Sequence, residues 1–128
     1  MTTEMDRVLW ISLAGAAGTA ARYLLTMVIT QRFGTAFPAG TVVVNLTGCF
    51  IMAALMTVGG HLGWSQTARM AATVGFLGGF TTYSSFNQET MMLWERGATS
   101  AAMLNLAVTL VGGLAAGWVG VMVGRRMI

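Results

Sequence analysis

The stretch GFLGGFTTYSSF, residues 75 to 86, places neutral hydrogen-bond donors inside a strongly apolar part of the chain. Threonine and serine donate through hydroxyl groups and asparagine through an amide, and none of these side chains carries a negative charge. Such donors suit a dehydrated anion, which a carboxylate would repel. The donors are Thr81, Thr82, Ser84, Ser85 and Asn87, with Asn45 and Asn105 in other apolar segments. The alternative role is structural, because a threonine often bonds a carbonyl of its own helix.

Aromatic rings are interleaved with these donors. Tyr83 and Phe86 are three residues apart, so they are neighbours on one face of a helix, and Phe76, Phe80 and Tyr83 form an overlapping stripe. The edge of an aromatic ring is electropositive, so ring edges turned toward a pore would hold a small anion without a charged group. Simple packing is the alternative for such a stripe.

A pair of glycines precedes the donors. Gly78 and Gly79 are adjacent and two threonines follow, a combination that favours a break in a helix as well as close packing. Broken backbone at membrane depth is tolerated only where protein or a water-filled cavity satisfies the freed polar groups. We therefore expect this break to lie inside the protein or beside a cavity.

The elements that position these residues are membrane helices. Of the 128 residues 55% are hydrophobic and only 9% are charged, which indicates an integral membrane protein. A span needs about 20 apolar residues. Four such spans can be drawn, and the short connections between them leave one domain over residues 1–128: Val8 to Ile29, Pro38 to Gly60, Ala68 to Leu93 and Ala98 to Val123. The predicted fold is all-α, with a break in the third helix.

The charges within these spans are few. Arg22 is the one formal charge well inside a span, and it is expected to face a cavity or a polar partner, or to reach the membrane surface. Glu89 falls near the end of the third span, so the interior is expected to lack a carboxylate. This absence favours an anion, or no transported substrate. Asn105 and Thr109, four residues apart, add a short polar ladder to the fourth helix.

Other sites are limited by composition. The basic residues are seven scattered arginines, which do not form the stripe expected of a nucleic-acid surface. Cys49 and His61 are the single cysteine and histidine, so an internal disulfide and a clustered His/Cys metal site are excluded. The arginines flanking the four spans give only a weak orientation bias.

The motifs together resemble the Fluc (CrcB) family of fluoride channels. GAAGTAARY (15 to 23) is similar to the first-helix motif of that family, GTVVVNLTGCF (40 to 50) to its second-helix asparagine motif and GFLGGFTTYSSF to its third-helix signature. LNLAVTLVGG (104 to 113) is similar to its fourth-helix polar track. The resemblance implies an antiparallel, dual-topology homodimer in the bacterial inner membrane. It also implies two pores that export fluoride passively down its electrochemical gradient and so protect the cell from fluoride.

The resemblance also implies site residues. A structural sodium ion (Na+) at the dimer interface would be held by the main-chain carbonyls of Gly78 and Thr81, and Arg22 would have a vestibule or structural role. The implied fluoride pathway comprises Asn45, Thr82, Tyr83, Ser85, Phe86, Asn105 and Thr109. Two positions depart from the family pattern. Tyr83 replaces a phenylalanine, and Gly113 lacks the side-chain donor common at its place on the polar track.

Three other classes of protein share some of these features or must be compared with them. A small multidrug exporter also has four helices, but it needs a membrane-embedded glutamate, and the first span has none. A non-transporting membrane scaffold would tolerate the packing glycines but would not need threonines beside a helix break. An enzyme is not expected, because neither a nucleophile–base pair nor a metal constellation is present.

Overall fold

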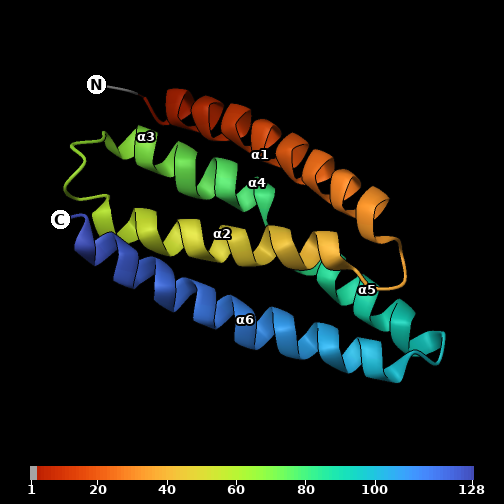
Figure 1. Ribbon diagram of the computed structural model, residues 1–128. Coiled ribbons are helices and arrows are strands. Elements are labelled where there is room, and N and C mark those ends of the chain that lie inside the picture. Colours follow the sequence, from red (N-terminus) through yellow and green to blue (C-terminus); the bar gives the residue numbers. More distant parts are fainter. Residues whose placement is uncertain (1–2) are drawn as a thin grey trace.

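The computed structural model describes residues 3–128, and this part of the chain contains helices and no strands. The elements are α1 (Glu4–Phe33), α2 (Ala39–Val58), α3 (Gln66–Met70), the π-helical segment η1 (Ala71–Leu77), α4 (Gly78–Phe80), α5 (Tyr83–Glu95) and α6 (Thr99–Arg126). Figure 1 shows long rods lying side by side, with both labelled ends at the same end of the bundle. Helices α1, α2 and α6 are each long and apolar enough to cross a membrane.

Turn and capping residues set the helix ends. Thr3 and Asp6 form a capping box at the start of α1, in which each side chain accepts a hydrogen bond from the other's backbone N–H. Gly34 (φ 81°) ends α1, and Gly97 (φ 76°) lies between α5 and α6, both in a conformation that favours glycine. The helix α1 extends four residues beyond each end of the predicted span, since polar terminal turns continue the backbone hydrogen bonding outside the apolar stretch.

The third predicted span is not continuous. Its helix runs from α3 through α4, stops after Phe80 and restarts at Tyr83 as α5. The break therefore falls at Thr81 and Thr82 rather than at the glycine pair, and Gly78 itself begins α4. The π-helical turns of η1 directly before the break were not anticipated from the sequence. π-Helical turns are rare in proteins overall, and those that occur are often at functional sites.

The two sides of the break pack against different helices. Segments η1 and α4 pack against α1, whereas α5 packs against α6. Figure 1 shows the same exchange, with the green α4 beside the red α1 and the teal α5 beside α6. The helix α2 contacts both halves and packs most extensively on α6. The break therefore lies where α1, α2 and α6 are all within reach.

Glycines permit the close helix contacts. A Cβ at Gly18 would meet the carbonyl oxygen of Phe76, and one at Gly120 would meet that of Phe50. Gly79 packs in the same way on Gly15 of α1. In contrast, the Gly113 and Gly117 positions are open enough for a Cβ, with nearest neighbours at 3.6 and 4.0 Å. Only some of the helical glycines therefore serve tight packing.

Candidate functional site

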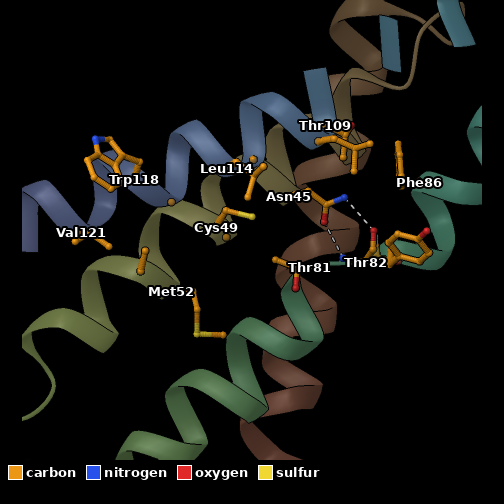
Figure 2. Close-up of a pocket in the computed structure, with 16 residues that line it drawn as sticks. Asn45, Cys49, Met52, Thr81, Thr82, Phe86, Thr109, Leu114, Trp118 and Val121 are labelled. Atoms are coloured by element: carbon orange, nitrogen blue, oxygen red, sulfur yellow. Dashed lines mark hydrogen bonds between the residues drawn. The ribbon is translucent and has the colours of Figure 1, made fainter. Parts of the chain in front are cut away.

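The break is held by Asn45 of α2. Thr81 (φ −86°, ψ 156°) and Thr82 (φ −151°, ψ 118°) have extended backbones. The Asn45 side chain makes two hydrogen bonds to the Thr82 backbone: Nδ2 donates to the carbonyl oxygen at 2.9 Å, and Oδ1 accepts from N–H at 2.8 Å. Figure 2 shows both bonds as dashed lines. Extended backbone that would be unsatisfied inside the protein is thus paired by one buried amide.

The hydroxyl groups around the break fall into two sets. The Thr82 hydroxyl caps α5, accepting from the N–H of Ser85 at 3.2 Å and lying 3.3 Å from the hydroxyl of Ser84. Its own proton is directed toward the Ser85 hydroxyl at 3.2 Å. The hydroxyls of Thr81 and Thr90 instead donate to carbonyls of their own helix, at Leu77 and Phe86. Thr81 and Thr90 therefore have the purely structural role of bonding a carbonyl of their own helix, whereas the Thr82 hydroxyl does not.

A cavity of about 690 Å³ opens beside the break. The predicted pathway residues Asn45, Thr82, Tyr83, Phe86 and Thr109 all contribute to its wall, whereas Ser85 and Asn105 do not. The remaining lining comprises Thr81, Gly113 and nine residues that were not predicted: Gly48, Cys49, Met52, Ala53, Leu110, Leu114, Gly117, Trp118 and Val121. Figure 2 shows polar groups gathered at the Asn45 end and apolar side chains toward Trp118. Four-residue steps from Asn45 to Cys49 and from Thr109 through Gly117 could have identified part of this wall.

The aromatic stripe divides at the break into two pairs. The rings of Tyr83 and Phe86 meet edge to face, with centroids 5.7 Å apart and planes at 65°. Phe76 and Phe80 stack nearly parallel at 6.1 Å on the other side of the break. Phe86 is only 4% exposed, whereas Tyr83 is 76% exposed. Only the first pair lines the cavity, where Trp118 contributes a further aromatic ring.

Asn105 lies in the protein interior, 1% exposed. Its Nδ2 donates to the hydroxyl of Thr90 at 2.8 Å, and its Oδ1 accepts from the hydroxyl of Thr109 at 3.4 Å. The predicted ladder on one face of α6 is therefore present, and it joins α6 to α5 through Thr90. Asn105 acts on the cavity only through Thr109, which is part of the wall.

Comparison with known proteins identifies the family. Residues 9–121 match the family model described as CrcB-like protein, Camphor Resistance (CrcB). The chain belongs to this CrcB-like family. It is 47% identical to the Fluoride-specific ion channel FluC of Sorangium cellulosum over 125 residues, which cover 97% of this chain and 98% of that one. It is 42% identical to a protein of the same name from Citrifermentans bemidjiense, over 96% of this chain and all of the relative. A third FluC, from Acidobacterium capsulatum, is 39% identical over 95% and 98% of the two chains.

The expectation of a carboxylate-free interior is wrong for this CrcB-like chain. Glu89 of α5 is half-buried and accepts a hydrogen bond from the hydroxyl of Thr41 at 2.8 Å. Its second oxygen, Oε2, is buried and has no hydrogen-bond partner within residues 3–128. A smaller cavity of about 250 Å³ adjoins it, with Thr30, Thr35 and Arg96 in its wall. The sequence placed Glu89 near the helix end, but the packing of α2 on α5 covers it.

Arg22 is half-buried on α1 and has no hydrogen bond or ion pair to the described residues. It does not line the large cavity. Within one polypeptide, Arg22 is therefore not part of the site that the helix break and the aromatic rings form.

The side chains of residues 3–128 offer no cluster of three or more His, Cys, Asp or Glu that could hold a metal ion. Main-chain oxygens at the break, unlike the side chains, could bind a cation. In a continuous helix the N–H of Thr82 would donate to the carbonyl of Gly78, and that of Ser85 to Thr81. Both N–H groups donate elsewhere, to Asn45 and to the Thr82 hydroxyl. The carbonyls of Gly78 and Thr81 are thus released from their helical donors, which suits a hard cation that prefers oxygen ligands.

Proposed function

We propose that this protein is a fluoride-selective passive channel that exports fluoride down its electrochemical gradient and protects the cell from fluoride toxicity. The observation that carries the proposal is the similarity, along nearly the whole chain, to several proteins named fluoride-specific ion channel. The protein is a multi-pass bacterial membrane protein and a channel rather than an enzyme. The bacterial inner membrane is the location that fits this role.

The cavity wall suits the proposed ion. The polar end of the wall carries no formal charge, and the Tyr83 hydroxyl is engaged by no described residue and can donate to an anion. The hydroxyls of Thr82 and Thr109 can also donate once they turn away from Ser85 and Asn105. The rings of Tyr83 and Phe86 would add electropositive edges. An ion that leaves water needs such donors to replace its hydration shell, and a narrow lining favours the smaller halide. The membrane potential supplies about 2.3 kcal/mol per charge per 100 mV, so no coupled energy source is required.

We further propose that two chains assemble antiparallel, with two pores at their interface. Three features support this arrangement. The large cavity is an open groove on the single chain, Tyr83 in its wall is 76% exposed, and Gly78 beside the break is also exposed. A partner would cover these groups and close the groove into a pore. The two halves of the broken span, α3–α4 and α5, would together make one further crossing, the third in chain order.

A sodium ion on the dimer axis completes the proposal. The carbonyls of Gly78 and Thr81 would hold it, with the equivalent pair from the second copy. Such an ion supplies a fixed positive charge that ties the two breaks together. The residues fit this role because their carbonyls have lost their helical donors. Arg22 is proposed to draw anions toward the vestibule or to brace the fold.

The exporter alternative is less well supported. Proton-coupled exchange needs a carboxylate that alternates between proton and substrate, and Glu89 has the required chemistry. However, its Oε1 is engaged by Thr41, and Glu89 is outside the wall of the large cavity.

Fluoride efflux from proteoliposomes tests the proposed function. Vesicles containing purified protein and potassium fluoride are diluted into fluoride-free buffer, and potassium permeability is supplied by an ionophore. A fluoride electrode is expected to record rapid release that requires the ionophore, whereas a chloride electrode on matched vesicles records none. Retention of fluoride by vesicles shown to contain folded protein would contradict the proposal. Drug-dependent proton flux would instead favour the exporter.

A further inference from the structure

We propose that Asn45 is a positioning residue that holds the helix break open and thereby keeps the Gly78 carbonyl free to bind a cation. This inference rests on the proposed function and on the proposed sodium site. It differs from a direct role in contacting the permeating anion, because Oδ1 and one N–H of Asn45 are engaged with the backbone of Thr82.

The contact between Asn45 and Thr82 has the geometry of a clamp. Thr82 is 37 positions further along the chain, and both hydrogen bonds are buried. The amide matches the N–H and C=O of one extended residue, as a neighbouring strand would. A side-chain amide has two N–H donors and one carbonyl oxygen. Only one N–H of Asn45 is therefore left for any other partner.

The hydrogen bond that Asn45 Oδ1 accepts determines whether the Gly78 carbonyl is free. The N–H of Thr82 has two possible acceptors: the Gly78 carbonyl, if the helix continues, or Asn45 Oδ1, if the helix breaks. The structure shows the second arrangement. The donor half has less effect on the break, because the Thr82 carbonyl can also accept the first hydrogen bond of α5.

A second residue of α2 supports the same geometry. Gly48, three positions after Asn45 and so on the same face, lies directly against the side chain of Thr81, where a Cβ would overlap its methyl group. One face of α2 thus contacts both extended residues, Thr81 and Thr82. In contrast, a Cβ built on Gly78 has only one neighbour within 4 Å, the Thr73 carbonyl oxygen at 3.8 Å, which leaves that side of the break open.

The clamp predicts that sodium binding and the Asn45 side chain are linked. Removing the acceptor oxygen frees the Thr82 N–H to return to Gly78, so the cation loses a ligand. Asn45→Asp keeps an oxygen that accepts from the Thr82 N–H, replaces the donor with an oxygen that faces the Thr82 carbonyl, and adds a negative charge beside the pathway. The two variants therefore separate the clamp from a role as anion donor.

The experiment measures thermal unfolding of the purified full-length protein in detergent, as sodium replaces N-methylglucamine at constant ionic strength. Asn45→Ala is expected to raise the sodium concentration at half-maximal stabilisation by about tenfold or more, as expected for loss of one ligand to a cation. Asn45→Asp is expected to leave this midpoint at or below that of the unaltered protein while lowering fluoride efflux. Asn105→Ala is the matched control, since it removes another buried amide away from the break. It should lower the unfolding temperature without moving the sodium midpoint.

Three results would overturn the proposal. The first is an unchanged midpoint in Asn45→Ala with fluoride efflux lost, which would make Asn45 an anion donor only. The second is a midpoint raised in Asn45→Asp, which also decides the matter if the alanine variant does not fold. The third is unaltered protein whose unfolding is insensitive to sodium. Fluoride efflux from the same preparation tests the channel function separately.

Discussion

Tyr83 stands where the resemblance to the family leads us to expect a phenylalanine, and Tyr83→Phe tests what the added hydroxyl does. The side chain is 76% exposed, and its hydroxyl makes no hydrogen bond to the part of the chain that the structure describes. Its ring contacts Phe86 edge to face, a contact that phenylalanine preserves. The substitution is therefore expected to leave the unfolding temperature of the protein unchanged.

The effect on conduction follows from the hydrogen bond that the hydroxyl would make to fluoride. A hydrogen bond to a charged group contributes about 1.5–3 kcal/mol. An ion held this much more tightly leaves about ten to a hundred times more slowly. If release from this position limits conduction, Tyr83→Phe accelerates fluoride efflux within that range.

The assay compares initial fluoride efflux from proteoliposomes containing equal amounts of either protein, at low protein density so that each vesicle holds at most one channel. Tyr83→Ile serves as the control, because it removes ring and hydroxyl together and should not accelerate efflux. A clear loss of efflux in Tyr83→Phe, with folding intact, would refute this reasoning and show that the hydroxyl is a required ligand.

Three further substitutions test the pathway and the packing. Phe86→Ile removes the buried ring edge and is expected to abolish fluoride efflux while the protein still elutes as unaltered protein does in size-exclusion chromatography; undiminished efflux would remove Phe86 from the pathway. Gly18→Ala places a methyl group against a carbonyl of η1 and is expected to destabilise the fold by about 1–3 kcal/mol in thermal or denaturant unfolding, whereas Gly60→Ala meets no neighbour and should be close to neutral. Thr90→Val keeps the side-chain shape but leaves the Asn105 amide without its acceptor, so a loss of about 1–3 kcal/mol is expected, and an unchanged unfolding free energy would show that another group replaces it.

The sequence contained the main determinants of the break but not its exact position. Glycines followed by threonines predicted unwinding, and the structure places it at Thr81 and Thr82. Gly79 packs tightly on α1 and stays helical, so tertiary contact overrode its local preference. The partner that fixes the position, Asn45, is 37 residues away from Thr82, and no local pattern shows such a pairing.

Burial was the other property that the sequence left undetermined. Glu89 and Asn105 are both polar residues in apolar segments, yet only the packing of α5 between α2 and α6 decides which polar atoms lose contact with solvent. The apolar half of the cavity, including Trp118 and Val121, was missed for a related reason. Apolar residues on a membrane helix look alike in sequence whether they face lipid or a cavity.

The exchange of neighbours at the break has a consequence for biogenesis. Helix α5 rests mainly on α6, which is the last element to be synthesised and inserted. Until α6 arrives, Asn105 is absent and the hydroxyl of Thr90 lacks the donor it receives in the finished chain. The helices α2 and α5 therefore lack their main packing partner until α6 enters the bilayer. Because α6 also supplies Thr109 and Trp118, the wall of the large cavity is completed last.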